Sequence, residues 1–106
     1  MDLAIRELLA RLKKGLEELY GERLKGVYVF GSYGRGQADE HSDIDVLIVL
    51  DEVPHYGEEI ARTSELIGRL SLESNRSISR VFASAERWRE GQSMFFLNVR
   101  QEAQPV

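Results

Sequence analysis

The sequence predicts an α+β domain in which helices pack against a small β-sheet, and three observations support this prediction. Stretches whose apolar residues recur at helical spacing alternate with short continuous apolar runs, which are typical of buried strands. The order along the chain is helix, strand, loop, strand, helix, strand and helix. A length of 106 residues, with 42% hydrophobic and 30% charged side chains, fits one globular domain over residues 1–106.

The first predicted helix covers residues 3–20, whose apolar side chains recur every three or four positions. Asp2 is expected to cap the start of this helix, and Gly21 is expected to end it. Residues 26–30, Gly-Val-Tyr-Val-Phe, are apolar on both faces and therefore predict a short buried strand. This strand leads directly into a glycine-rich stretch over residues 31–36.

The second predicted strand covers residues 44–50, Ile-Asp-Val-Leu-Ile-Val-Leu, and follows a polar loop over residues 37–43. The remaining predicted elements are a helix over 57–72, a strand over 77–83, a short helical turn from Ser84 to Trp88 and a helix over 93–103. In the last helix Phe95 and Phe96 are adjacent, so they cannot both point to the same side. We expect aromatic packing in the core there, with one of the two rings free to face a partner.

Charge and residue types exclude several classes of protein. Lysine and arginine total 14 and aspartate and glutamate 18, so the net charge of −4 argues against a generally basic nucleic-acid surface. The absence of cysteine excludes a disulfide scaffold, a thiolate zinc site and a cysteine nucleophile. No apolar run approaches the roughly 20 residues of a membrane helix, and no secretory signal is present. We therefore expect a cytoplasmic protein that binds neither nucleic acid nor a membrane.

Asp43 and Asp45 stand one residue apart at the start of the second predicted strand. Because strand side chains alternate with a period of two, both carboxylates are expected on one face, with their Cα atoms roughly 7 Å apart. Two such carboxylates can converge on one Mg²⁺, which prefers carboxylate and phosphate oxygens. Isolated Asp-x-Asp pairs are also frequent in loops, so the pair alone leaves a metal site and a solvent-exposed edge as alternatives.

The glycine-rich stretch Gly31-Ser32-Tyr33-Gly34-Arg35-Gly36 begins where the first strand ends. Such a turn presents backbone N–H groups and a hydroxyl to an anion, because glycine has no Cβ to hold a phosphate away. Arg35 either adds a cation to the same anion or lies on the surface. The stretch is neither a Walker-type loop nor a dinucleotide fingerprint, since Gly-Lys-Ser/Thr is absent and a strand follows. Taken alone, it is also a common turn.

The two features together resemble the signature of the nucleotidyltransferase superfamily related to DNA polymerase β, and most closely its minimal nucleotidyltransferase members. Ten residues separate Ser32 from Asp43. The matching positions are Gly31, Ser32, Gly34 and Gly36, with Arg35 among them, for phosphate binding, and Asp43 and Asp45 for metal binding and catalysis. The resemblance implies the palm-like fold, a small mixed β-sheet flanked by helices. It also implies Mg²⁺-dependent transfer of a nucleoside monophosphate, expected to be AMP from ATP, to a hydroxyl group.

The chain departs from this family at the third acid, which the family usually carries on the next strand. Ser79 stands at the expected position in Ile78-Ser79-Arg80-Val81, and the nearest upstream carboxylate is Glu73. Without this acid, nucleotide and one Mg²⁺ would bind while the acceptor hydroxyl stays unactivated. Two functions remain open: an active nucleotidyltransferase, and a catalytically impaired module that binds nucleotide or neutralises a partner protein sterically.

The resemblance further implies a protein partner. Many minimal members act as antitoxins that pair with a separate helical toxin of the HEPN type, and some adenylylate a tyrosine on that partner. A 106-residue chain has no second domain to supply an acceptor site, so a separate acceptor-bearing partner is expected. An RNA acceptor is the weaker alternative because of the acidic charge balance. The acceptor, the base specificity and a homo-oligomeric state remain open.

Overall fold

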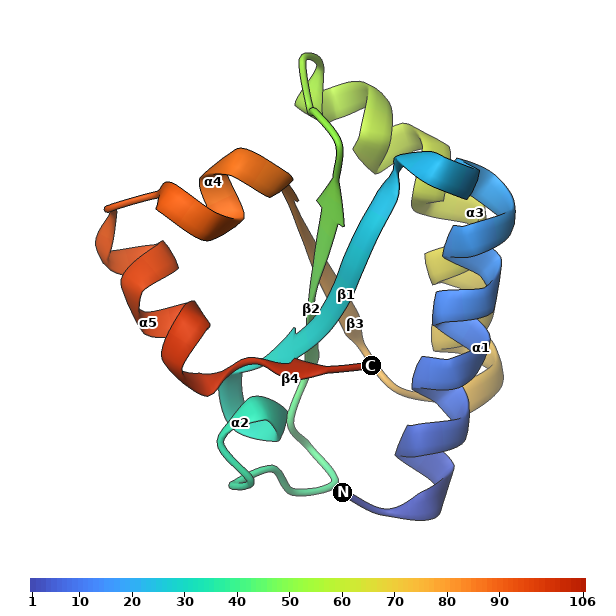
Figure 1. Ribbon diagram of the computed structural model, residues 1–106. Helices are drawn as coiled ribbons and strands as arrows, with labels where there is room; N and C mark the ends of the chain where they lie inside the picture. Colours follow the sequence, from blue (N-terminus) through green and yellow to red (C-terminus); the bar gives the residue numbers. More distant parts are fainter.

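The computed structural model describes residues 1–106 and places a four-stranded mixed β-sheet between two layers of helices (Figure 1). The strand order is β3-β2-β1-β4. The bounds of the strands are β1 Leu24–Phe30, β2 Ile44–Leu50, β3 Ile78–Ser84 and β4 Gln104–Pro105. β2 runs antiparallel to β1 and parallel to β3, and β4 runs antiparallel to β1. The predicted α+β class and mixed sheet are confirmed.

The first helical layer consists of α1, Leu3–Tyr20, and α3, Tyr56–Ser74. Their apolar stripes pack on one face of the sheet, where Ile44, Val46, Ile48 and Leu50 of β2 are completely buried. The prediction for the first helix is confirmed, since the Asp2 carboxylate accepts a hydrogen bond from the Ile5 N–H at 2.9 Å and the helix ends before Gly21. A short 3₁₀ turn, η1 Gly21–Arg23, then leads into β1.

The second helical layer consists of α4, Ala85–Glu90, and α5, Met94–Glu102. These helices cover the opposite face of the sheet, where Phe96 and Val99 pack on Leu47 and Val49. Ser84 and Ser93 cap the two helices, as predicted. Phe96 is buried, whereas Phe95 is 38% exposed and contacts another ring edge-on, so the two rings do point in different directions.

Besides the turn η1, two short elements were absent from the sequence prediction. The glycine-rich stretch forms one helical turn, α2 Gly31–Gly34, and residues Gln104–Pro105 form β4 on the outer side of β1. Both depend on contacts between segments that are distant in the sequence, which local patterns do not encode. The other predicted elements match the observed ones to within two residues at their ends. No helix is both long and apolar enough to span a bilayer.

The outer edge of β3 is partly covered by α3. The backbone N–H of Phe82 donates to the Tyr56 hydroxyl at 3.2 Å instead of to another strand. Tyr56 also packs edge-on against the Phe82 ring, with 5.8 Å between the ring centroids. On the other side of the sheet, β4 pairs with Tyr28 and Val29 of β1. The outer edges of β3 and β1 are therefore both partly occupied by other segments of the same chain.

Candidate active site

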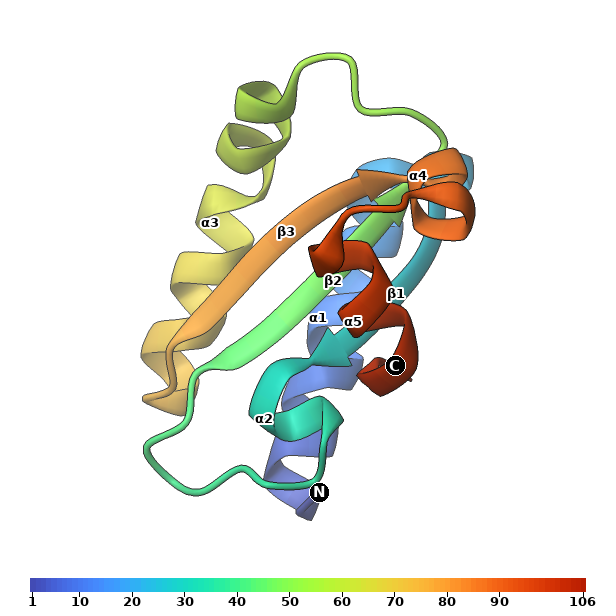
Figure 2. The same ribbon diagram turned by 90° about the vertical axis from the view of Figure 1, so that its left-hand side faces the viewer.

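The register between β1 and β2 brings the glycine-rich turn to the aspartate pair. Phe30, the last residue of β1, lies opposite Asp45. Gly31 follows directly with φ +65°, and a Cβ at this position would lie only 2.3 Å from Asp45 Oδ2. Glycine is therefore required here both for its backbone conformation and for the contact with the carboxylate. Figure 2 shows α2 at this end of the sheet, beside the start of β2.

The Asp45 carboxylate is half-buried, whereas Asp43 lies just before β2 and is exposed. Burial raises the pKa of Asp45, and the charges of Asp43 and Glu102 raise it further, while Arg35 opposes them. Asp45 thus carries a negative charge in a place that disfavours it, and a bound cation would relieve this penalty.

This donor set fits Mg²⁺, because carboxylate oxygens are the hard ligands that this ion prefers. No group of three or more acidic or histidine side chains converges into a closed metal cage. Mg²⁺ commonly binds through one or two carboxylates together with phosphate oxygens and water. Asp43 and Asp45 are therefore sufficient as protein ligands when a nucleotide supplies the remaining oxygens.

The remaining residues of the glycine-rich turn occupy different environments. Ser32 is half-buried, and Arg35 and Gly36 are exposed. Gly34 is buried against α5, where a Cβ would lie 2.8 Å from the Glu102 carbonyl oxygen. Gly34 therefore has a packing role in addition to its place in the predicted phosphate-binding turn.

Glu102, at the end of α5, was missed by the sequence analysis. Its Oε1 accepts a hydrogen bond from the Gly31 N–H at 3.3 Å, and its Oε2 pairs with Arg35 Nη1 at 3.1 Å. The Glu102 carboxylate thus binds two of the groups that the sequence analysis assigned to phosphate. Glu102 lies 71 residues from Gly31 along the chain, and no local signal connects the two residues.

The position of the third acid lies beside Asp45 in the structure. Ser79 pairs with Asp45 in the parallel register between β2 and β3, so both side chains belong to the same face of the sheet, and Ser79 is exposed. Arg80 points to the opposite face, where its Nε donates to Thr63 Oγ1 at 2.7 Å. Glu73 of α3 pairs with Arg11 of α1 in the other helical layer. Glu73 therefore does not supply the carboxylate that is missing at Ser79, and the Arg80 cation does not lie beside Asp45.

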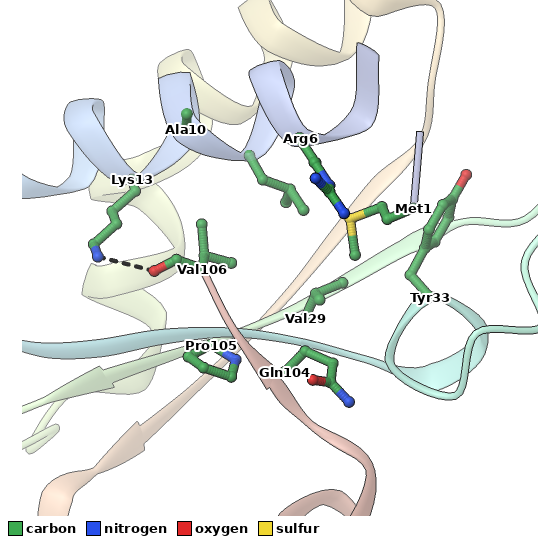
Figure 3. Close-up of a pocket in the computed structure, with 10 residues that line it drawn as sticks. Met1, Arg6, Ala10, Lys13, Val29, Tyr33, Gln104, Pro105 and Val106 are labelled. Carbon is green, nitrogen blue, oxygen red and sulfur yellow. Dashed lines mark hydrogen bonds between the residues drawn. The ribbon is translucent and has the colours of Figure 1, made fainter. Parts of the chain in front are cut away.

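A cavity of about 610 Å³ lies elsewhere, between α1 and the strands β1 and β4 (Figure 3). Apolar side chains make up most of its lining, together with Arg6 and Lys13, and Lys13 Nζ donates to the Val106 carbonyl oxygen at 2.8 Å. None of its lining side chains carries a carboxylate, so the cavity lacks the side-chain ligands that Mg²⁺ prefers. The end of the sheet at Gly31 and Asp45 is the stronger candidate.

Comparison with known proteins identifies related sequences. The profile of a family described as "Nucleotidyltransferase domain" matches residues 9–92, which include both aspartates and Ser79 but not Glu102. A provisionally named protein adenylyltransferase of Methanocaldococcus jannaschii is 36% identical over 73% of this chain and 77% of its own length. The protein adenylyltransferase MntA of Thermococcus cleftensis is 48% identical over 47% of this chain and 48% of its own. Several of the matched relatives are thus covered over only about half of their length.

Solved structures show the same fold. A provisionally assigned minimal nucleotidyltransferase superposes with a TM-score of 0.62 and 27% identity, covering 100% of this chain and 97% of the other. A toxin-antitoxin complex crystallised with AMP-PNP contains a chain that superposes with a TM-score of 0.61. That match covers 89% of this chain and 68% of the other at 19% identity, so it supports the fold alone.

Proposed function

This chain belongs to the nucleotidyltransferase domain family, and from that premise we propose that it transfers AMP from ATP to a hydroxyl group of a partner protein in a Mg²⁺-dependent reaction. The observation that best supports the proposal is the register between Phe30 and Asp45. It brings a turn that begins with a glycine at positive φ and two carboxylates to the same end of the sheet.

The proposed roles follow from the chemistry of each group. Asp43 and Asp45 would hold Mg²⁺, which neutralises charge on the triphosphate when bound. The Gly31 N–H and the Ser32 hydroxyl would donate to the β- and γ-phosphates, and Arg35 would add a cation. Binding in this way would orient the α-phosphorus towards the acceptor, and positioning together with electrostatic stabilisation supplies most of the rate in such transfers.

In the proposed transfer, a bond forms between the acceptor oxygen and the α-phosphorus. The bond from the α-phosphorus to the oxygen that bridges it to the β-phosphate breaks, and pyrophosphate leaves. The acceptor proton passes to solvent, because Ser79 offers a hydroxyl instead of a carboxylate base. General-base assistance typically contributes about 10²–10⁴ in rate, so transfer without it is expected to be slow.

For the acceptor we propose a helical HEPN-type partner, with this chain as the antitoxin of a toxin-antitoxin pair in the cytoplasm. Matched relatives are named protein adenylyltransferases, and structural neighbours come from toxin-antitoxin complexes. The net charge of −4 also favours a protein acceptor over RNA.

The experiment follows the α-phosphate of ATP. The protein is incubated with Mg²⁺, ATP labelled on the α-phosphate and the helical protein encoded by the adjacent gene. We expect label on that partner, and background label with the double variant Asp43→Asn, Asp45→Asn. The control variant Asp51→Asn, Glu52→Gln removes two exposed carboxylates just beyond the far end of β2 and should transfer normally. Equal transfer by both double variants would contradict the proposal.

The alternative function is an impaired module that binds nucleotide without transferring it, and the serine beside Asp45 favours this alternative. Calorimetry with MgATP and the label assay distinguish the two functions. The alternative predicts binding without transfer in the wild type, and transfer by Ser79→Asp, because the new carboxylate restores a base and a metal ligand. Measurable transfer by the wild type supports the enzyme.

A further inference from the structure

The loop that carries Asp43 is held by one arginine from another part of the chain. Arg76 lies between α3 and β3 and is half-buried. Its Nη2 donates to the Ser42 carbonyl oxygen at 3.0 Å and to the Asp39 carbonyl oxygen at 3.3 Å. The same nitrogen contacts the Tyr33 hydroxyl, and the guanidinium carbon lies 5.6 Å from the centroid of the Tyr33 ring. Arg76 therefore links three residues of the segment between β1 and β2.

These contacts reach both halves of the candidate active site. Tyr33 directly follows Ser32 in the glycine turn, and Ser42 directly precedes Asp43. The Tyr33 ring is buried, so it provides a fixed point for the guanidinium. Because one cation bonds to both segments, it sets the position of the Asp43 backbone relative to the phosphate-binding turn.

Few other hydrogen bonds connect this loop to the rest of the chain. Those of its side chains run within the loop or to Tyr33 and Arg35, such as the Asp39 N–H to Ser42 Oγ at 3.0 Å. At its two ends, the backbone N–H of Gln37 donates to the Ser32 carbonyl oxygen at 2.9 Å and that of Ile44 to the Ser77 carbonyl oxygen at 2.8 Å. Asp45 belongs to a paired strand, whereas Asp43 lies outside it and is exposed. Metal ligands must be held within about 0.5 Å of the productive geometry, and strand pairing does not hold Asp43 directly.

We propose that Arg76 is a positioning residue that fixes the Asp43 loop and thereby sets the affinity of the site for Mg²⁺-bound nucleotide. This inference rests on the proposed function, in which Asp43 is a metal ligand. Arg76 acts through the backbone of Ser42 and through Tyr33, and it does not itself touch the nucleotide. Partners that orient metal ligands in this way typically contribute about 10–100-fold to metal affinity or activity.

The chain offers a matched control at Arg80. Its guanidinium also has three acceptors, Thr63 Oγ1 and the Ile60 carbonyl oxygen at 2.7 Å each and Ser64 Oγ at 3.2 Å. All of these acceptors belong to α3, on the face of the sheet opposite Asp45. Arg80→Gln therefore removes a similar set of hydrogen bonds without touching the Asp43 loop.

The test is calorimetric titration of wild type, Arg76→Gln and Arg80→Gln with ATP, with Mg²⁺ and then with EDTA. We expect Arg76→Gln to bind MgATP at least about 10-fold more weakly than wild type, with little change in EDTA, because the loss acts through a metal ligand. Arg80→Gln should bind MgATP with an affinity within about twofold of that of the wild type, since it leaves the contacts of Arg76 with the Asp43 loop intact. Arg76→Lys keeps a cation near the two carbonyl oxygens and should recover part of the affinity. Equal weakening by Arg76→Gln and Arg80→Gln, or equal losses with and without Mg²⁺, would overturn the inference.

Hydrogen exchange separates this inference from the proposed function. The amides of residues 39–43 should exchange faster in Arg76→Gln than in Arg80→Gln, whether or not nucleotide binds. If the wild type does not bind MgATP, the proposed function fails, and faster exchange in Arg76→Gln still supports the role of Arg76 in fixing the loop. Unchanged exchange in Arg76→Gln would overturn the inference even if the wild type binds MgATP.

Discussion

Replacing Gly31 with alanine should damage the candidate site through two separable effects. The backbone has φ +65° at this position, and a residue with a Cβ loses about 1–2 kcal/mol in that left-handed conformation. The new Cβ would also lie 2.3 Å from Asp45 Oδ2, closer than such atoms can approach. The carboxylate must therefore move, and displacing a packed group typically costs about 1–3 kcal/mol more.

Gly36→Ala measures the first effect alone. Gly36 has φ +72°, and a Cβ there would have no atom within 4 Å. We therefore expect Gly36→Ala to cost about 1–2 kcal/mol and Gly31→Ala about 2–5 kcal/mol. For a domain of this size, each kcal/mol lowers the melting temperature by roughly 4–8 °C.

Thermal unfolding of both variants, followed by MgATP calorimetry below their melting temperatures, tests this reasoning. Gly31→Ala should also lose nucleotide affinity, whereas Gly36→Ala should retain more of it. In an Asp45→Ala background the additional cost of Gly31→Ala should disappear, because the contact that causes it is gone. The reasoning would be refuted if the two glycine variants lost equal stability, or if the additional cost persisted without the Asp45 carboxylate.

Two further predictions concern carboxylates at the site. Burial and the charges of Asp43 and Glu102 raise the pKa of Asp45 in the folded state, and Arg35 opposes them. The protonated carboxyl group therefore contributes its full stability below the unfolded pKa of 3.8, and this stability is lost as the pH rises through the folded pKa. Without Mg²⁺, Asp45→Asn should therefore melt at a higher temperature than wild type at pH 7 and at nearly the same temperature at pH 3; equal melting at pH 7 would contradict this. Glu102→Gln should bind MgATP about fivefold more tightly, because the neutral amide no longer forms the partly exposed ion pair with Arg35, which is worth roughly 1 kcal/mol. Weaker binding in that titration would indicate that Glu102 supports the site instead.

The sequence predicted well the elements that their own side chains determine. The helix 3–20 and the strand 44–50 have the predicted bounds, because apolar periodicity and the Asp2 cap are local signals. α2 and β4 were missed because they depend on tertiary contacts. The single turn of α2 packs against α5, and β4 is only two residues long.

For the candidate site, the sequence indicated which residues to examine but not all of their neighbours. The family resemblance placed Gly31 and Asp45 in one site and Ser79 at the position of the third acid, and the register brings Phe30, which precedes Gly31, and Ser79 beside Asp45. Glu102 and Arg76 could not be predicted in the same way. Glu102 is 71 residues from Gly31 and Arg76 is 34 residues from Ser42, so only the folded chain brings them together.

The contact between Tyr56 and the backbone of Phe82 also bears on how this protein avoids aggregation. An exposed strand edge is a template on which another chain can add a strand. At the β3 edge, the Tyr56 hydroxyl already accepts an outward N–H that an incoming strand would need. At the β4 edge, Pro105 has no N–H to offer. Amyloid-like growth by strand addition is therefore disfavoured at both outer edges of the sheet, β3 and β4.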